Sequence, residues 1–536
     1  MKTETVYDIL NMLQTMQDAV KQMKEEYVNQ NLGMFNTLSM DLWDGLLTVQ
    51  DMFKADAPTD DRNRLAEACI CALASLKDIR ILSVKHSEKT EWKLEYELLA
   101  VIETMALQFY YWYIVNKQPE MREIFLTFVA NSETFRILRR ISKDCKFEFD
   151  LTICVTGYNH LSYTKQCVNS ILENLPRGIS YELILINHGS TDGTKEYFES
   201  IKGARVINIA VNGALPGVYI KAFKGRCILS VSNDVIIGKN AISNLYRCVT
   251  ENRDYGYIVP STPAVSNLQT IPAAYDNGEQ FLKFTAQNNI YNERRHEQRV
   301  RLCNPATMVP TSVYLQYLMS MYVDIFCYGN MLLFPDDRLS LWMRRNGYKN
   351  ILAKDAFCHH FGSITIKRDI EKQEEKQLFY QDGRKAFYDR YGIDPWGPGF
   401  CFDPGLFDEW EISVTDHAVI LGINCGLGSN SLKLKEVLKE KGAVDTKLYN
   451  CVQQKRYLKD LQGISDKAFL FFELGDIINM IERRQYNYIV AEEPIQGTTQ
   501  ESPVEDILNA GLEFDELAYK SPDGKWRIVK RDISKQ

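Results

Sequence analysis

The sequence lacks several features that would assign a protein quickly to a class. Its 13 cysteines include no paired CxxC knuckles, and an odd, dispersed set of this kind indicates reduced thiols rather than a zinc ribbon. It has no surplus of positive charge, because 63 Lys and Arg stand against 70 Asp and Glu, which argues against a nucleic-acid partner. No basic stretch followed by an apolar core opens the chain, so we expect a cytoplasmic protein.

An uninterrupted hydrophobic run is also missing. The most apolar window, "YELLAVIETMALQFYYWYIV", contains Glu97 and Glu103. Acidic residues are costly inside a bilayer, so the window favours a buried helix over a transmembrane segment. A chain of 536 residues with 45% hydrophobic and 25% charged residues fits two to four globular domains.

Residues 1–147 show helical periodicity and almost no strand signal. In "YDILNMLQTMQDAVKQMKEEY", apolar residues recur every three or four positions and form one stripe opposite the charges. The stripe comprises Ile9, Leu10, Leu13, Met16, Val20 and Met23. We expect an α-helical bundle of four or five helices, which would also hold the contact of a homo-oligomer if one forms.

Strand and helix signals alternate from about residue 149. The segments "FDLTICVTGYN", "YELILIN", "ARVINIA" and "RCILSVSND" predict strands, and "LSYTKQCVNSILENL" predicts a helix between the first two. This order predicts βαβ units and a mostly parallel sheet within residues 148–390. Ligands of such sheets bind beyond the carboxyl ends of the strands, where "GYN", "NHGSTDGT" and "SND" fall.

A segment rich in Pro, Gly and aromatic residues, 391–411, is the predicted linker to a third region, 412–536. That region opens with "HAVILGINCGLGSNSLKLKEVLKEKGA", which predicts a strand, a glycine-rich turn and a helix. "YNYIVAEEPI" predicts a buried strand and "KWRIVKRD" a closing edge strand. We expect a small Rossmann-like α/β domain here.

Four motifs in order resemble family 2 glycosyltransferases: "TGYNHLSYTKQCVNSIL", "NHGSTDGT", "SND" and "DDRLSLWMRRNGY…HHFGS". The resemblance covers about residues 149–368 and implies the α/β GT-A fold, which is Rossmann-like. It also implies transfer of a sugar from a nucleotide-diphosphate donor, commonly a UDP-sugar, to an acceptor hydroxyl with inversion. By architectural analogy, the acceptor would be Ser or Thr of a protein such as flagellin, or a surface glycan.

The resemblance assigns a nucleotide-binding role to five residues of these motifs. Tyr158 would stack on the base, since a ring at a strand end offers an apolar face. Asn187 replaces an Asp that pairs with the base, and it keeps an acceptor oxygen, so we expect altered donor binding rather than its loss. Ser190, Asp192 and Asn233 complete the set, with helix capping as the alternative for the first two.

The resemblance also predicts a site for Mn²⁺ or Mg²⁺. Asp234 matches the last Asp of the family's metal motif, while Ser232 replaces the first. His359 or His360 would add an imidazole, and the sequence does not decide between them. The cation would offset charge on the leaving diphosphate.

Asp336 matches the family's catalytic base, which takes the acceptor's proton as its oxygen attacks the anomeric carbon. Asp337 is the reserve candidate if the register slips by one residue, and Pro335 replaces the preceding Glu. The alternative is that both Asp residues only cap a helix, whose N-terminal end favours negative charge.

The glycine-rich turn of the third region resembles a class I methyltransferase in degenerate form. No carboxylate follows the strand at Gly422 or stands near Asn450, and Asn424 replaces the first motif glycine. We therefore expect a domain that binds no cofactor and serves interaction or acceptor docking.

Two further functions stay open at this point. Asn187, Ser232 and Pro335 depart from the transferase pattern and favour an inactive scaffold or binding protein. The glycine-rich turn alone favours a methyltransferase with an accessory sugar-binding domain.

Overall fold

The computed structural model describes residues 2–54, 60–212, 218–327, 334–362, 373–404, 417–443, 445–498, 503–510, 512, 516–520 and 527–530. The chain divides into two compact units. The first comprises Met1–Leu172, Arg177–Asn233 and Pro310–Leu332, and the second comprises Glu173–Pro176, Asp234–Val309 and Leu333–Gln536. The division runs through the middle of the predicted transferase region, and the predicted domain boundaries stay predictions.

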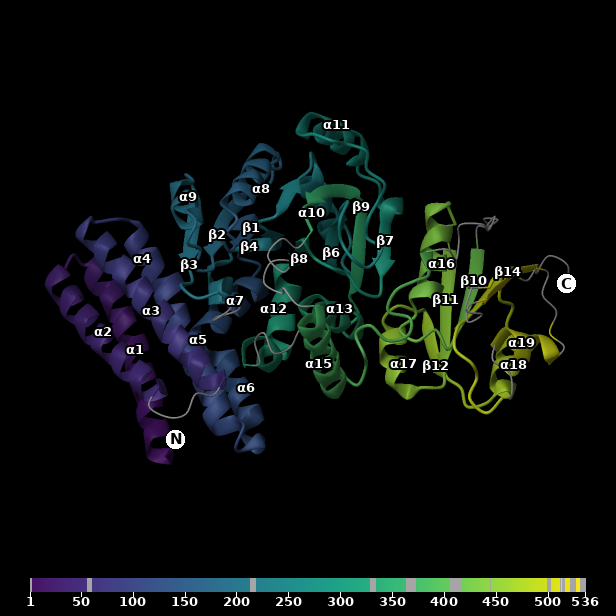
Figure 1. The fold of residues 1–536 in the computed structure, drawn as a ribbon, viewed down its shortest axis with the longest axis horizontal. Helices are drawn as coiled ribbons and strands as arrows, with labels where there is room; N and C mark the ends of the chain where they lie inside the picture. The colour runs from purple at the N-terminus through teal and green to yellow at the C-terminus, as the bar shows by residue number, and fades with distance from the viewer. Residues whose placement is uncertain are drawn as a thin grey trace. The chain divides into compact units, whose positions relative to one another are not determined.

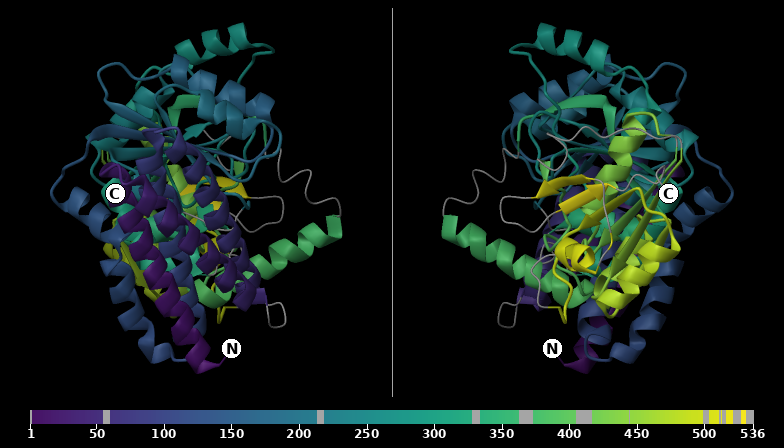
Figure 2. Two further views of the ribbon diagram at one scale, coloured as in Figure 1. Left: turned by 90° about the vertical axis from the view of Figure 1, so that its left-hand side faces the viewer. Right: turned by 90° about the vertical axis from the view of Figure 1, so that its right-hand side faces the viewer.

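Helices make up the N-terminal part of the first unit, as predicted (Figures 1 and 2). They are α1 (Thr3–Val28), α2 (Leu32–Lys54), α3 (Asp60–Val84), α4 (Lys89–Lys93), α5 (Leu99–Tyr110), α6 (Arg122–Asn131) and α7 (Glu133–Lys143), with a short 3₁₀ turn at Pro119–Met121. Five of the six residues in the predicted stripe of α1 are buried, namely Ile9, Leu13, Met16, Val20 and Met23. Leu10 is half-buried, and Val6 extends the buried face. Burial of this stripe against α2 and α5 explains why the segment is helical.

The most apolar window lies in one continuous helix, Lys89–Val115, which includes π-type turns at Leu94–Leu98 and Tyr111–Val115. This helix is long and apolar enough to cross a membrane, yet 67% of its most apolar window is buried inside the protein. Glu97 accepts hydrogen bonds from Lys93 at 2.8 Å and from the backbone N–H of Asn208 at 2.9 Å. Trp112 Nε1 donates to the carbonyl of Cys327 at 2.8 Å, so both ends of the helix are anchored within the first unit.

Four parallel strands of the first unit confirm the predicted βαβ units. In the order β3 (Ala204–Asn208), β2 (Tyr181–Asn187), β1 (Phe149–Gly157) and β4 (Gly225–Ser232), each pairs with the next. The connecting helices are α8 (Leu161–Glu173) and α9 (Thr194–Ser200), and Val218–Ala222, α12 (Thr311–Ser320) and Val323–Cys327 add short helical segments. The strands are buried along most of their length, which explains their near-continuous apolar sequences.

The second unit continues with a mixed sheet rather than a parallel one. β6 (Tyr255–Ser261) pairs parallel with β9 (Lys349–His360), whereas β5 (Val235–Ile237), β7 (His296–Arg299) and β8 (Ala306–Pro310) pair antiparallel with β9 or β6. The helices of this part are α10 (Ala241–Glu251), α11 (Gly278–Asn288), a 3₁₀ turn at Glu293–Arg295, and α13 (Pro335–Arg345). The prediction of a mostly parallel sheet was based on strands that end before residue 235. It therefore did not describe the strands β5 to β9.

The C-terminal region, as predicted, contains a second α/β sheet. Its strand order is β12 (Lys467–Leu470), β11 (Asp445–Val452), β10 (His417–Ile423), β13 (Tyr488–Ala491), β15 (Arg527–Lys530) and β14 (Glu516–Lys520). Helices α15 (Gln373–Tyr391), α16 (Ser429–Glu440), α17 (Lys455–Gln462), α18 (Leu474–Arg483) and α19 (Pro503–Asn509) accompany it. The prediction that "KWRIVKRD" forms an edge strand was wrong, because the unpredicted β14 pairs with the outer side of β15.

Candidate functional site

The carboxyl ends of β1, β2 and β4 meet at one edge of the first unit's sheet. Gly157 pairs in register with Asn187, and Thr156 pairs with Ser232. The residues that follow these strands, including Tyr158, therefore lie at the edge where α/β sheets bind ligands. The Tyr158 side chain is half-buried at this edge, as a base-stacking ring would be.

Hydrogen bonds join the loops that follow β1 and β2. Asn187 is buried, with its Oδ1 accepting the N–H of Ser190 at 3.0 Å and its Nδ2 donating to Asn208 Oδ1 at 3.2 Å. Ser190 Oγ accepts the N–H of Asn159 at 2.9 Å, and Asn159 Oδ1 accepts the N–H of Thr191 at 2.9 Å. The amide of Asn187 thus shapes the loop, and its predicted pairing with a base stays a prediction.

Asp192 joins the first turns of two helices. Its Oδ2 accepts the N–H of Leu161 at 2.8 Å, and its Oδ1 accepts from the hydroxyl of Thr194 at 2.7 Å and its N–H at 3.2 Å. Desolvation works against the charged form, but these bonds outweigh it and hold the pKa of Asp192 below its usual value. The carboxylate is therefore charged at neutral pH and fixed as a helix cap.

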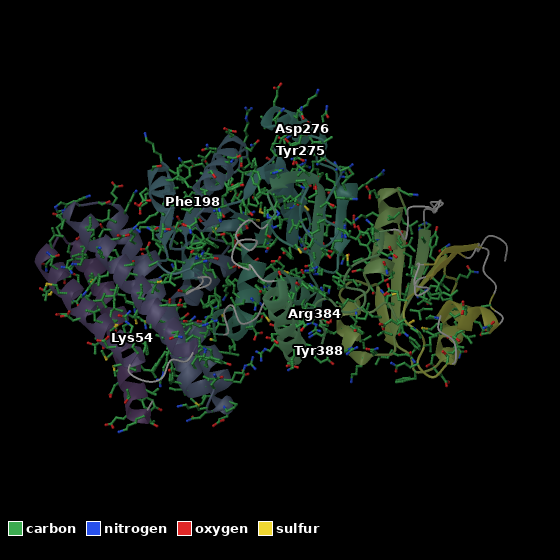
Figure 3. The ribbon with its side chains drawn as sticks, in the orientation of Figure 1. Lys54, Phe198, Tyr275, Asp276, Arg384 and Tyr388 are labelled. Carbon is green, nitrogen blue, oxygen red and sulfur yellow. The ribbon has the colours of Figure 1, made fainter. Side chains whose placement is uncertain are left out.

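Asn233 closes the same edge from the end of β4. Its Nδ2 donates to the carbonyl of Asn159 at 3.0 Å and to Thr164 Oγ1 at 2.8 Å. Phe198 of α9 (Figure 3) packs beneath, where a Cβ added to Gly157 would lie 3.1 Å from its ring. All five residues predicted to bind the nucleotide therefore lie at one edge of the sheet, where hydrogen bonds join the loops that follow the strands.

His188 lies in this edge, and the sequence assigned it no role. Its backbone N–H donates to the carbonyl of Gly157 at 2.9 Å, and the centroid of its ring lies 6.4 Å from that of Tyr219. Burial lowers the pKa of His188 to about 4, so the ring is neutral at physiological pH. Within the described residues, its buried Nδ1 has no hydrogen-bond partner, a signal that sequence alone could not provide.

In the second unit, Asp234 faces His360 rather than His359. The two residues lie at the paired ends of β5 and β9, and Asp234 Oδ2 is 3.4 Å from His360 Nε2. His360 Nδ1 lies 2.6 Å from the carbonyl oxygen of Ala264, which can only accept, so Nδ1 carries a proton. In a neutral ring the Nε2 lone pair then points toward the carboxylate, an arrangement that a shared cation would satisfy.

His359 lies on the opposite face of β9, because side chains alternate along a strand. Its Nδ1 is 2.6 Å from the hydroxyl of Tyr275 (labelled in Figure 3). Burial, with a smaller contribution from His360, lowers the pKa of His359. Among the residues placed by the structure, no group of three or more His, Cys, Asp or Glu could hold a metal, so a cation here would need oxygens from its ligand.

The two acidic residues at the start of α13 differ in environment. Asp337 forms a two-point ion pair with Arg301, at 2.5 Å from Nε and 3.0 Å from Nη2. Asp336, by contrast, accepts the backbone N–H of Asn304 at 3.3 Å. Desolvation, with repulsion from Asp337, raises the pKa of Asp336 to about 7 against an opposing pull from Arg301. Asp336 is therefore poised to exchange a proton near neutral pH.

The glycine-rich turn after β10 is filled by the chain's own linker. The N–H of Leu427 donates to the carbonyl of Pro398 at 2.9 Å, and that of Ser429 donates to the carbonyl of Gly399 at 3.1 Å. A Cβ on Gly399 would lie 2.1 Å from the carbonyl oxygen of Cys425, so the approach is close. The N–H groups that would face a bound cofactor are thus occupied within the chain.

A cavity of about 530 Å³ lies elsewhere in the first unit, among α3, α4, α9 and β3. Its lining includes Trp92, Lys195 and Arg205, and none of the motif residues above. The cavity is therefore separate from the edge at which the motifs gather.

Comparison with known proteins identifies the region that carries the first three of these motifs. Residues 152–318 match the sequence model of "Glycosyl transferase family 2". This match covers less than half of the chain. The match includes the strands β1–β4, whose carboxyl ends carry Asn187 and Asn233, and it ends before α13.

Two curated bacterial proteins are similar over short stretches. A poly(ribitol-phosphate) β-glucosyltransferase of Bacillus spizizenii is 29% identical over 111 residues, which is 19% of this chain and 18% of that protein. An uncharacterized glycosyltransferase of Mycoplasma genitalium is 26% identical over 120 residues, which is 20% of this chain and 40% of that protein. The chain therefore spans well under half the length of either relative.

Solved structures are similar only in part. Residues 1–349 of TarS from S. aureus align with 15% identity and a TM-score of 0.29, covering 46% of this chain and 72% of that one. GalNAc-T7, solved with UDP, GalNAc and Mn²⁺, aligns with 12% identity and a TM-score of 0.30, covering 40% and 44%.

Proposed function

We propose that the protein is a metal-dependent, inverting glycosyltransferase that moves a sugar from a nucleotide-diphosphate donor, a UDP-sugar in the first instance, to an acceptor hydroxyl. The family 2 domain at residues 152–318 supports the reaction class. The observation that carries the proposal is Asp336, a half-buried residue at the first turn of α13 whose pKa is raised to about 7. A base with a pKa near the working pH is what proton removal from an acceptor hydroxyl requires.

Asp336 would take the acceptor's proton as the hydroxyl oxygen attacks the anomeric carbon. A single displacement from the face opposite the leaving diphosphate inverts the configuration at that carbon. Asp337 would not share this role, because Arg301 holds it by two hydrogen bonds. Desolvation, with the charge of Asp337 as a second cause, instead keeps the neighbouring Asp336 protonated until the pH nears 7.

The donor would bind at the edge of the first unit's sheet where the carboxyl ends of β1, β2 and β4 meet. Tyr158 would stack on the base, while the hydrogen bonds of Asn187, Ser190 and Asp192 fix the shape of the loops beside it. The neutral His188, with its orphaned Nδ1, adds a hydrogen-bonding position beside them.

Asp234 and His360 would hold Mn²⁺ or Mg²⁺. Their 3.4 Å separation, with His360 Nδ1 turned to the carbonyl of Ala264 and Nε2 toward Asp234, fits a shared cation, and Mn²⁺ accompanies UDP in the GalNAc-T7 structure. When bound, the cation would supply positive charge against the departing diphosphate. Because Asp234 follows Asn233 directly in the chain, the cation ligand continues the nucleotide-binding motif.

The acceptor is a protein Ser or Thr, as in flagellin, or a surface glycan, and the protein acts in the cytoplasm, with self-association through the N-terminal helices. The curated relative that acts on poly(ribitol-phosphate) supports the glycan choice. We propose no cofactor for the C-terminal region, since the linker carbonyls of Pro398 and Gly399 occupy its glycine-rich turn. This observation disfavours a methyltransferase.

An inactive scaffold is the second candidate, favoured by the inward-facing amide of Asn187. Incubation with UDP-glucose, UDP-N-acetylglucosamine and GDP-mannose plus Mn²⁺ separates the two, with released nucleoside diphosphate as the readout. We expect turnover with at least one donor, lost in Asp336→Asn and retained in Asp254→Asn, an exposed carboxylate paired with Lys349 at 2.6 Å. Binding of UDP should be the same in both variants. No release with any donor, together with no UDP-induced thermal shift, would support the scaffold.

A further inference from the structure

The last turn of α13 is held by a carboxylate from the C-terminal region. Arg344 Nη2 donates to Asp460 Oδ1 at 2.8 Å, and Arg345 donates to Asp460 Oδ2 at 2.7 Å from Nη2 and 3.2 Å from Nε. The side chains of Asp460 and Arg344 are 0% and 3% exposed. Both oxygens of a fully buried carboxylate therefore serve arginines of α13, and removing one partner of such a pair is strongly unfavourable.

The backbone confirms how tightly the two segments meet. A Cβ added to Gly463, just after α17, would lie 2.3 Å from the carbonyl oxygen of Arg344. Around this contact, Leu341 of α13 belongs to the same apolar core as Leu461 and Ile464 of the C-terminal region. The C-terminal region thus shares a core with the helix that carries Asp336.

The contact connects to the two acidic residues through one backbone segment, residues 300–304. Arg344 donates from Nη1 to the carbonyl of Val300, which also accepts from Asn350 Nδ2 at 3.1 Å. The next residue, Arg301, forms the ion pair with Asp337 at the other end of α13. Halfway along, the N–H of Leu302 donates to Ser340 Oγ at 3.1 Å.

Segment 300–304 therefore braces α13 at its start, its middle and its end. At the end of α13, the contact with this segment is made by the buried guanidinium of Arg344, and Asp460 is the carboxylate that balances its charge. The pKa of Arg344 is lowered by desolvation, which Asp460 opposes, so loss of Asp460 would favour withdrawal of Arg344 from the brace.

We infer that Asp460 is a positioning residue for α13, and that the C-terminal region is a working part of the transferase. The inference rests on the proposed role of Asp336 as the base. The glycine-rich turn of the C-terminal region is already occupied by linker carbonyls, so it leaves no room for a cofactor. The region instead holds helix α13 in position.

The test compares Asp460→Asn with Glu440→Gln. Glu440 pairs with Lys354 at 2.7 Å across the same contact, but its side chain is 46% exposed, so it controls for loss of any ion pair there. In Asp460→Asn we expect kcat to fall about 100-fold, as for a small misplacement of a catalytic group, with donor KM unchanged. Amide hydrogen exchange should accelerate in residues 335–345, while Glu440→Gln keeps wild-type values in both measurements.

Wild-type kcat and unchanged exchange of residues 335–345 in Asp460→Asn would overturn the inference. If the wild-type protein releases no nucleoside diphosphate from any donor, the proposed function fails, and the exchange measurement still decides whether Asp460 positions the helix. If Asp460→Asn does not fold, the double variant Arg344→Met with Asp460→Leu replaces the buried pair by apolar contact. We expect it to fold and to keep a low kcat, because the bond to Val300 is missing, whereas a wild-type kcat would contradict the inference.

Discussion

Replacing Asp336 with asparagine should abolish transfer and, at pH 8, make the protein more stable. The ordinary pKa of the Asp336 carboxyl, 3.8, is raised to about 7 in the folded protein, first by desolvation and then by Asp337. Between these two pH values the folded protein keeps a proton that the unfolded chain has released. Stability therefore falls as the pH rises from about 4 to about 7, and stays at the lower level above that range.

The size of the effect follows from the two pKa values. A difference of about 3 pKa units, at 1.36 kcal/mol each, means that the charged carboxylate costs about 4 kcal/mol of stability at pH 8. With an unfolding entropy of about 2.1 cal/mol/K per residue, this corresponds to a rise of about 4 °C in the Tm of the variant. Asparagine keeps the acceptor oxygen for the N–H of Asn304, so that bond is not lost.

Differential scanning calorimetry of wild type and variant from pH 4.5 to 8.5 measures this difference. We expect Tm values within about 1 °C of each other near pH 4.5, and a gap that widens toward pH 8. Asp337→Asn is the matched control, because it leaves the buried Arg301 without its carboxylate and should lower stability by about 3–5 kcal/mol. A Tm of Asp336→Asn below that of wild type at pH 8, or a gap that does not change with pH, would refute the reasoning.

Three further predictions concern the proposed activity and the donor edge. The rate of nucleoside diphosphate release at saturating donor should rise about tenfold per pH unit below pH 7 and level off above it, since Asp336 must lose its proton; a flat profile from pH 5 to 8 would contradict its role. Gly189→Ala should lower the Tm and the donor affinity more than Gly178→Ala. Both glycines have a positive φ, +74° and +75°, but only at Gly189 would the added Cβ meet a backbone oxygen, at 2.4 Å. Equal effects of the two substitutions would show that the close approach does not matter. His360→Gln should raise the Mn²⁺ concentration for half-maximal activity by about tenfold or more and His359→Gln should not, as titration with Mn²⁺ would show; the reverse order would exchange their roles.

The pH profile of Asp336 reflects several charged and titratable groups around it. Asp337 raises its pKa, whereas Arg301 and Arg338 lower it. Tyr257 of β6 and Cys303 also face the carboxyl, and each senses its charge. Both have a raised pKa because of burial, so they stay neutral across the predicted transition. Desolvation also raises the pKa of Asp337 against the pull of Arg301, so the transition belongs to the coupled pair Asp336 and Asp337.

Local sequence sufficed for the elements whose signal is local. The run "YELILIN" is strand β2 at its predicted bounds, because a short run with four consecutive apolar residues next to turn signals has no comparable helical alternative. The stripe of α1 was equally readable, since residues three and four apart lie on one face of a helix. The mixed sheet that follows Asp234 was not predicted, because antiparallel partners such as β5 and β9 lie far apart in the chain.

The amino-acid sequence by itself determined which chemical groups the protein has: the ordered motifs, the Asp pair at the start of a helix and the His pair at the end of a strand. Only the tertiary structure decided between members of each pair. Asp337 is ion-paired because Arg301, 36 residues away in sequence, reaches it, and Asp336 is left half-buried with a raised pKa. His360 faces Asp234 because pairing of β5 with β9 fixes which face each residue presents. Burial and long-range pairing set the charge of a group, and neither can be read from its neighbours in the chain.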